Sequence, residues 1–281
     1  MSAPLSETAP AKINLTLRVV GRRPDGYHAL ESLVAFADLA DSLSLEPAER
    51  LSLDVTGPFA DACGPLDDNL ILKAARAMAL PAGHFILDKR IPVAAGLGGG
   101  SADAAAALRL MARRNGLLAN DARILAAARA TGADVPVCLE PQSRIMRGAG
   151  EELSGPIALP RLDALLVNPG VAVSTRAVFA AFSPADKPGA ALGEVPLERN
   201  ELVRWLARHG NDLARAAIGH APVIAGVLEA LADSPGCRLA RMSGSGATCF
   251  GVFGSAAEAA KAAQRLSSAK ENWWICPATL G

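Results

Sequence analysis

The chain has 281 residues, 51% of them apolar, and it carries 28 basic and 28 acidic residues. This length is sufficient for one large or two ordinary globular domains with buried cores. The balanced charge leaves no basic excess to bind a nucleic-acid backbone or an anionic membrane surface. We therefore expect a small-molecule partner, and neither nucleic acid nor a membrane.

The five cysteines are far apart and form no C-x-x-C pair, which argues against a disulfide framework or a zinc ribbon. The first residues, MSAPLSETAP, lack the basic patch and apolar run of a signal peptide. No apolar stretch reaches the roughly 18 residues of a membrane span. These features predict a cytoplasmic protein, and they leave open whether it is a monomer or a homodimer.

Strand patterns dominate the first part of the chain. The alternation in AKINLTLRVV predicts a half-buried strand over residues 11–20, with Lys12 and Asn14 on its polar face. After the turn segment GRRPDG, the short alternating pieces LVAFADLADSLSLEP and RLSLDV predict an antiparallel sheet. NLILKAARAMAL predicts a helix that follows Asp67 and Asp68, and HFILDKRIPV predicts another strand.

Helical patterns follow a glycine cluster at residues 96–100. An alanine-rich helix is predicted to end near residues 113–116, and ARILAAARATG predicts a second helix before DVPVCL. Regularity is lost near residue 147, which predicts a domain boundary there. Both sides of it mix strands and helices, so the fold class is α+β with two domains. We expect one domain over residues 1–147, completed by 272–281, and one over 148–271.

The part after the boundary contains a second, smaller glycine cluster. It begins with the strand-like ALLVNPGVAV and a Pro-rich loop near residues 184–196, followed by helical patterns over 199–232. The glycine cluster lies in MSGSGATCFGVF and is followed by the helical AAEAAKAAQRL. NWWICPATL predicts a closing strand.

The first glycine cluster combines Gly96, Gly98, Gly99 and Gly100 with Ser101 at a helix start. Bare backbone N–H groups at a helix N-terminus favour a phosphate. The segment matches neither the Walker fingerprint nor the dinucleotide fingerprint, because no lysine follows and the sixth position counted from Gly96 is Ser101. A purely structural turn is the alternative, at a cost of roughly 0.5–1 kcal/mol for each glycine relative to alanine in regular structure.

PVAAGLGGGSADA, residues 92–104, resembles the second motif of the GHMP kinases, in which this loop wraps the phosphates of ATP. PAKINLTLRV resembles their first motif and MSGSGATCFGVF their third, a glycine-rich loop beside the active site. The family usually has glycine where this chain has Ala94. The resemblance implies the GHMP kinase fold, with an N-terminal ATP domain of the ribosomal-protein-S5-like type and a C-terminal α+β domain. It implies ATP binding by Pro92, Val93, Ala94, Ala95, Gly96, Leu97, Gly98, Gly99, Gly100, Ser101 and Ala102, with the third-motif loop at Ser243, Gly244, Ser245 and Gly246.

Within the GHMP kinases, these motifs together with TGADVPVCL are similar to the members that phosphorylate a tertiary hydroxyl of 4-diphosphocytidyl-2-C-methyl-D-erythritol in the non-mevalonate isoprenoid pathway. The resemblance implies that Asp134 is the catalytic base and Lys12 its partner. Taken alone, an aspartate at this junction is more often a helix cap, and a lysine on a strand is more often solvated. The substrate contacts it implies are Asn14, Tyr27, His28, Thr175 and Phe179.

The sole tyrosine, Tyr27, follows the Pro24-Asp25-Gly26 turn and precedes His28, a position that suits a flat ligand better than core packing. In the family this pair receives the cytosine, and the phenylalanine on the opposite face corresponds to Phe179. His28 could instead cap locally, and Phe179 could be part of a helix core.

Phosphoryl transfer also requires a metal to spread charge, and Mg²⁺ prefers oxygen ligands. Ser101 is the best candidate ligand, and Asp134 could contribute. Two alternatives stay open: another GHMP kinase acting on mevalonate, homoserine or a sugar, and a catalytically silent ligand sensor with the same fold. A serine hydrolase is disfavoured, because the chain has no G-x-S-x-G segment.

Overall fold

The computed structural model describes residues 5–24, 26–79, 82–183 and 189–281. Contacts between residues divide the chain into two compact units. Unit 1 comprises Met1–Lys12, Leu39–Val93 and Gly98–Pro141, and unit 2 comprises Ile13–Asp38, Ala94–Leu97 and Gln142–Gly281. Each unit is thus assembled from three separate segments. The domain boundaries expected from the sequence stay a prediction about which segments fold on their own.

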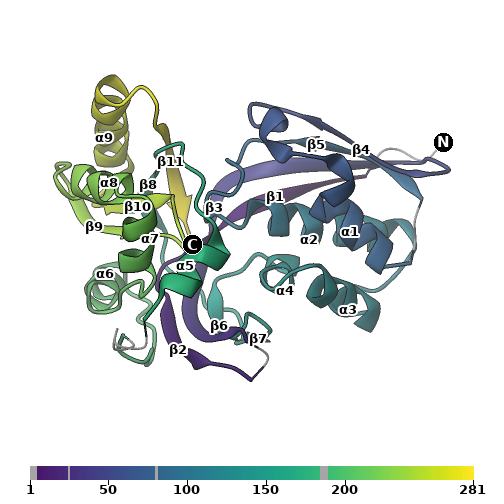
Figure 1. The fold of residues 1–281 in the computed structure, drawn as a ribbon, viewed down its shortest axis with the longest axis horizontal. Coiled ribbons are helices and arrows are strands. Elements are labelled where there is room, and N and C mark those ends of the chain that lie inside the picture. The colour runs from purple at the N-terminus through teal and green to yellow at the C-terminus, as the bar shows by residue number, and fades with distance from the viewer. Residues whose placement is uncertain (1–4, 25, 80–81, 184–188) are drawn as a thin grey trace. The chain divides into compact units, whose positions relative to one another are not determined.

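Unit 1 is a small sheet with a layer of helices beside it (Figure 1). Strand β5 (Gly83–Asp88) lies between β4 (Leu51–Thr56), to which it is parallel, and the end of β3 (His28–Glu46), to which it is antiparallel. Strand β1 (Leu5–Asn14) also pairs with β3. The helices are α1 (Leu70–Ala77), α2 (Gly99–Arg114), α3 (Ala122–Thr131) and α4 (Val135–Leu139), and two 3₁₀ turns cover Ala60–Cys63 and Leu66–Asp68.

Helix α2 is the centre of the helical layer and packs against α1, α3 and α4. Its run of alanines from Ala104 to Ala107 is buried, because small side chains allow neighbouring helices to approach closely. The helix begins after Gly98, which has a left-handed φ of 63°, and ends at Asn115 and Gly116, as predicted from the sequence.

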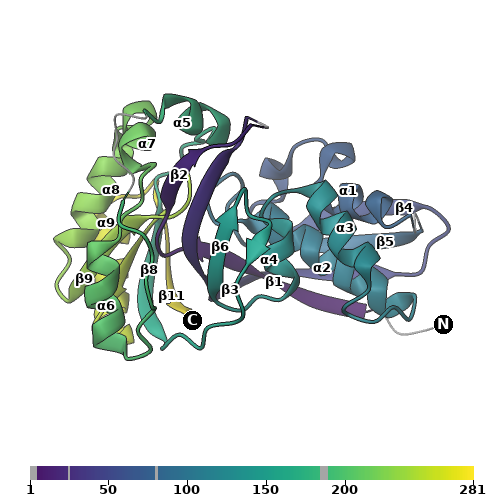
Figure 2. The same cartoon turned by 90° about the horizontal axis from the view of Figure 1, so that it is seen from below.

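Unit 2 contains an antiparallel sheet in the order β11, β8, β10, β9. Helices α8 (Val223–Ala232) and α9 (Ala256–Ala269) cover one of its faces (Figure 2). The sheet consists of β8 (Leu162–Asn168), β9 (Cys237–Met242), β10 (Cys249–Phe253) and β11 (Trp274–Leu280). The remaining elements are β2 (Arg18–Arg22), β6 (Arg144–Gly148), β7 (Glu152–Leu153), α5 (Thr175–Ala181), α6 (Arg199–Arg208) and α7 (Ala214–His220).

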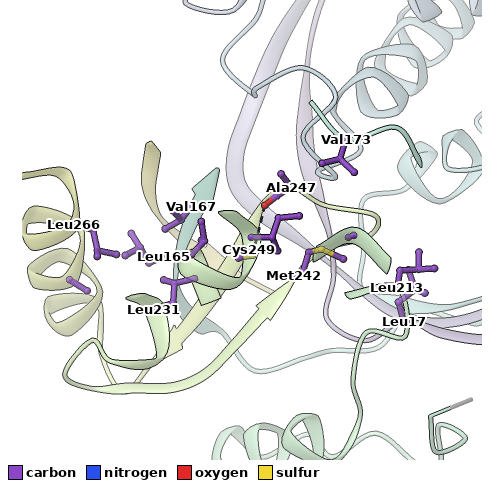
Figure 3. Close-up of a cluster of buried hydrophobic side chains, with 14 of the residues drawn as sticks. Leu17, Leu165, Val167, Val173, Leu213, Leu231, Met242, Ala247, Cys249 and Leu266 are labelled. Atoms are coloured by element: carbon purple, nitrogen blue, oxygen red, sulfur yellow. Dashed lines mark hydrogen bonds between the residues drawn. The ribbon is translucent and has the colours of Figure 1, made fainter. Parts of the chain in front are cut away.

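The core of unit 2 lies between this sheet and its helices (Figure 3). Leu165 and Val167 alternate along β8 toward Leu231 of α8 and Leu266 of α9, and all four side chains are at most 4% exposed. Alternate residues of a strand share a face, so this spacing places one apolar row against the helical layer.

Three expectations from the sequence need correction. The strand expected over residues 11–20 is two strands, β1 and β2, separated at residues 15–17. At this break the Leu15 N–H donates to the Leu33 carbonyl, and the Leu33 N–H donates to the Thr16 hydroxyl. The alternating pieces from residue 28 onward form one 19-residue strand, β3. The sheet is not purely antiparallel, because β4 runs parallel to β5.

Some expectations fall outside the described residues, namely Asp25 of the predicted turn and residues 184–188 of the predicted Pro-rich loop. In the rest of the chain, no helix combines the length and the apolar composition that crossing a membrane requires.

Candidate active site

The side chains of Lys12 and Asp134 meet in unit 1. Lys12 lies near the end of β1, and its Nζ is 2.9 Å from Oδ2 of Asp134. The ammonium side chain is 5% exposed and the carboxylate side chain 35% exposed. The Lys12 side chain is therefore buried, whereas the Asp134 carboxylate is partly exposed. A substrate hydroxyl could approach the carboxylate from its exposed side.

Asp134 occupies the N-cap position of α4, which is the structural role that an isolated aspartate most often has. Its side chain nevertheless makes no capping hydrogen bond to the helix. Pro136, in the first turn, has no N–H to be capped. The carboxylate is thus directed to Lys12 and not to the helix that it precedes.

Arg109, on α2, connects the elements that carry this pair. Its guanidinium donates to the Thr8 carbonyl of β1 at 2.8 Å and to the Cys138 carbonyl of α4 at 2.9 Å. Its Nε also donates to Glu7 at 3.2 Å. A planar guanidinium holds several acceptors in fixed directions, so Arg109 ties the strand of Lys12 to the helix of Asp134.

The start of α2 lies next to Lys12. A Cβ placed on Gly98 would be 3.1 Å from Cβ and 3.2 Å from Cε of Lys12, so a side chain at this position would crowd the lysine. Gly98 provides no side-chain cap to α2. The first N–H groups of the helix are therefore left for another acceptor, and with the positive end of the helix dipole they favour an anion.

In unit 2, the middle of the first glycine loop contacts the second one. A Cβ on Gly96 would lie 2.7 Å from the carbonyl oxygens of Ser243 and Gly246. The Ser243 hydroxyl donates to the Gly96 carbonyl at 2.9 Å, and the Thr248 N–H donates to the Ala95 carbonyl. Gly96 is thus required for contact between two protein loops, a purpose that the sequence did not indicate.

Asn14 is joined to the same loop. Its backbone N–H donates to the Ser243 hydroxyl at 3.1 Å, and its side-chain amide donates to Ser32 at 2.8 Å. Asn14 is 2% exposed. The contacts orient the amide within unit 2, and whether it contacts substrate stays a prediction.

The residues expected around the cytosine also lie in unit 2, but in a closed arrangement. The rings of His28 and Phe179 stack with centroids 5.1 Å apart and an interplanar angle of 24°. A base between two rings needs about 7 Å, twice the contact distance of carbon atoms. Tyr27 is 64% exposed, and the Thr175 hydroxyl is 2.8 Å from that of Ser245. The structure thus brings together His28 with Phe179 and Thr175 with Ser245.

Burial and the adjacent positive charge of Arg22 lower the pKa of His28 below its usual value of 6.5. Arg22 faces His28 directly across the β2–β3 pair. At neutral pH the imidazole is therefore uncharged, with one nitrogen that donates and one that accepts.

Comparison with known proteins adds direct evidence. The model of the GHMP kinases N terminal domain matches residues 69–141, and that of the GHMP kinases C terminal matches residues 190–272. The chain is 53% identical to a 4-diphosphocytidyl-2-C-methyl-D-erythritol kinase of Methylorubrum extorquens, over 98% of this chain and 99% of the relative. The chain belongs to the GHMP kinase family.

Two further GHMP kinases are similar over most of their length. A 4-diphosphocytidyl-2-C-methyl-D-erythritol kinase of Rhodopseudomonas palustris is 53% identical, with 96% of this chain and 97% of the relative covered. The crystal structure of a 4-(cytidine 5'-diphospho)-2C-methyl-D-erythritol kinase superimposes with a TM-score of 0.76 at 36% identity, covering 99% of both chains. The predicted family and fold class are therefore confirmed, and this GHMP kinase is an ATP-dependent small-molecule kinase.

Sequence reasoning missed two groups of residues in this GHMP kinase. Arg109 lies in an alanine-rich helix, and a single arginine there is usually a solvated residue. Lys89, Asp41 and Asp103 form a buried ionic cluster next to the start of α2. The available signal was weak: a Lys-Arg pair directly before the glycine loop, and an aspartate within a run of alanines.

Metal ligands are not evident from the protein side chains of this GHMP kinase alone. Within the described segments, no group of three or more His, Cys, Asp or Glu side chains is placed to hold a metal ion. Ser101 lies in the first turn of α2 and Asp134 is partly open. These two oxygen donors suit a Mg²⁺ that takes its other ligands from phosphates and water.

Proposed function

We propose that this protein transfers the γ-phosphate of ATP to the 2-hydroxyl of 4-diphosphocytidyl-2-C-methyl-D-erythritol. The observation that carries the proposal is the 2.9 Å contact between Lys12 and Asp134, with Lys12 also beside Gly98 at the start of α2. A base and a cation next to an uncapped helix start are what a kinase needs to bring a hydroxyl to a phosphate. The substrate is the one named for the relatives that are 53% identical.

The chain's own residues then have distinct tasks. The N–H groups of the glycine-rich loop and of the first turn of α2 bind the phosphates of ATP. Asp134 accepts the proton of the substrate hydroxyl, whose oxygen forms a bond to the γ-phosphorus while the bond to the ADP oxygen breaks. Lys12 orients the Asp134 carboxylate and stabilises the negative charge on the transferred group.

Ser101, with a contribution from Asp134, would hold a Mg²⁺ ion, and this ion would supply charge neutralisation for the phosphates. The open side of Asp134 and the position of Ser101 in the first turn of α2 fit this ion. The uncapped N-terminus of α2 supports phosphate binding at the same place.

We place the cytosine at Tyr27, His28 and Phe179, with Asn14 and Thr175 as further substrate contacts. The exposed ring of Tyr27 and the neutral imidazole of His28 support this assignment, since cytosine offers a flat face and both donor and acceptor groups. Because His28 and Phe179 stack on each other, the base must either separate these rings or stack on Tyr27 outside them.

We propose that the protein is cytoplasmic. The five cysteines are free thiols, which suits the reducing environment of the cytoplasm. We further propose that residues 1–147 act as the ATP domain and residues 148–271 as the substrate domain. Residues 272–281, which were expected to complete the ATP domain, pair through β11 with β8 of unit 2.

The deciding experiment is a substrate panel. Purified protein with Mg-ATP is given 4-diphosphocytidyl-2-C-methyl-D-erythritol in parallel with mevalonate, homoserine and galactose, and ADP release and the phosphorylated product are measured. We expect turnover with the cytidine substrate alone. Preference for another alcohol would assign a different GHMP kinase activity, and background turnover with all four would favour a silent ligand sensor.

A further inference from the structure

An ionic cluster that takes no part in the reaction above lies buried in unit 1. Lys89 follows the last residue of β5 and is 3% exposed. Its Nζ lies 2.5 Å from Oδ2 of Asp41 on β3 and 2.6 Å from Oδ2 of Asp103 on α2. One ammonium group is thus shared by two carboxylates from different elements.

The Asp41 side of the cluster holds the chain that leads into the glycine loop. Oδ1 of Asp41 accepts the backbone N–H groups of Arg90 at 2.5 Å and Ile91 at 2.8 Å. Two N–H donors and one ammonium therefore surround a single carboxylate. The residue that follows them is Pro92, the first residue of the loop.

The Asp103 side holds the helix that leaves the loop. Asp103 lies one turn after Gly99, the first residue of α2. A Cβ on Gly99 would be 3.1 Å from Nζ of Lys89, so the ammonium lies directly against the first turn of the helix. Lys89 therefore connects the entry and the exit of the loop, the two places where the chain leaves unit 1 and returns to it.

Burying the charged groups of this cluster costs free energy. Burial raises the pKa of Asp103, and the attraction of Lys89 offsets that effect only in part. Oδ1 of Asp103 has no hydrogen-bond partner among the described residues. Buried ion pairs are often no more stabilising than apolar side chains of similar volume, but they hold their elements in one arrangement.

We propose that Lys89, with Asp41 and Asp103, is a positioning device for the phosphate loop. It keeps Ile91 and the first turn of α2 at a fixed separation, so that the N–H groups of the turn are arranged before ATP arrives. Preorganised donors avoid the cost of ordering the loop on binding. This inference rests on the proposed function, because it assumes that the phosphates of ATP bind at the start of α2.

The test removes one of the two carboxylates of the cluster without leaving an unpaired buried charge. Asp103→Ala separates α2 from Lys89, while Lys89 keeps Asp41 as its counter-ion. We expect KM for ATP and Kd for a non-hydrolysable ATP analogue to rise about tenfold, with KM for the cytidine substrate and the melting temperature nearly unchanged. Asp103→Asn, whose amide oxygen can accept from Lys89, should restore ATP binding to within about threefold of wild type.

Controls separate positioning from general loss of structure. Arg123→Gln breaks an ion pair on the exposed surface of α3 in the same unit and should change none of these quantities. Asp103→Ser, too short to reach Lys89, carries the same expectation as the alanine variant and replaces it should the latter not fold.

Folded Asp103→Ala with ATP affinity within about twofold of wild type would overturn the proposal. So would failure of both the alanine and the serine variant to fold, since the cluster would then serve stability. Because the analogue-binding assay needs no turnover, it decides the question even if the wild type fails to phosphorylate the cytidine substrate, a result that would count against the proposed function only.

Discussion

At the scale of single residues, Lys12 and Asp134 occupy ordinary structural positions but contact each other. Asp134 stands where a helix cap is expected, yet its carboxylate contacts Lys12 and caps nothing. Lys12 stands on a strand but is 4% exposed. Each residue alone has an ordinary explanation, and only their contact indicates a proton acceptor with a neighbouring cation.

Asp134→Asn keeps the size of the side chain but removes its ability to accept a proton. We expect kcat to fall by about 10²- to 10⁴-fold, the usual contribution of a general base. Affinity for an ATP analogue should stay largely intact, because the amide still fits beside Lys12. Single-turnover assays and analogue binding measure the two effects, and a kcat within a few-fold of wild type would exclude Asp134 as the base.

A second prediction at this scale concerns pH. Because burial and Arg22 lower the pKa of His28 below 6.5, the midpoint at which the imidazole becomes charged lies at a lower pH than that value. KM for the cytidine substrate should therefore rise as pH falls, with a midpoint below the usual histidine value of about 6.5. In Arg22→Gln the loss of one cause raises the pKa, so this rise should begin at higher pH. Equal profiles in both proteins would show that the His28 charge does not affect substrate binding.

The glycine-rich loop shows what could be predicted at the residue scale and what could not. The sequence indicated the helix start, and the resemblance to the GHMP kinases indicated the departure at Ala94. The sequence could not indicate that Gly96 is needed for contact with residues 243 and 246, because that contact joins positions about 150 residues apart. Ala94 itself has a left-handed φ of 53°, an unfavourable backbone conformation for a residue with a Cβ.

At the scale of elements, Glu31 connects three segments of unit 2. It faces Arg18 across the β2–β3 pair and Arg147 across the β3–β6 pair, and it accepts from both side chains. It also accepts the N–H of Leu192 at 3.0 Å. Charged cross-strand pairs of this kind stabilise a sheet register.

Glu31→Gln should lower the free energy of unfolding by about 2–3 kcal/mol, since it leaves two arginines without a buried acceptor charge. Burial works against the charged form, but hydrogen bonds from Leu192, Arg147 and Arg18 lower the pKa of Glu31. This stabilisation is therefore present above its usual value of 4.5 and is lost as pH falls below it.

Denaturant unfolding at several pH values measures the effect. The variant should differ most from wild type at neutral pH and least in acid. A difference that is independent of pH would show that the charge of Glu31 is not what stabilises the sheet.

Helices were easier to predict than strand pairings. The helices α1, α2 and α3 begin at or near the predicted positions, because caps and apolar spacing are local signals. The break after Asn14 depends on hydrogen bonds with residues 32 and 33, and the parallel pairing of β4 depends on β5, about 30 residues later. Such pairings are set by distant partners that a local pattern does not contain.

At the scale of the whole molecule, the last strand closes unit 2. β11 is antiparallel to β8 along its full length, and Gly281 N–H donates to the Phe36 carbonyl. Deleting residues 274–281 would leave β8 as an unpaired edge with buried apolar residues exposed. We expect little soluble protein and no cooperative unfolding, as measured by circular dichroism.

Glu271→Gln, just before this strand, is the matched control and should fold normally. A truncated protein that is soluble and unfolds cooperatively would show that unit 2 does not need β11.

The division of each unit into three segments also sets the order in which the protein can be completed during translation. All of unit 1 lies within the first 141 residues, whereas unit 2 needs the last one. The 140 residues after Pro141 take roughly 7–28 s to synthesise at about 5–20 residues per second. For that interval residues 13–38, already made, have no complete sheet to join. Until β11 has been synthesised, the apolar strand residues within 13–38 of the nascent chain are therefore exposed to the ribosome surface and to chaperones.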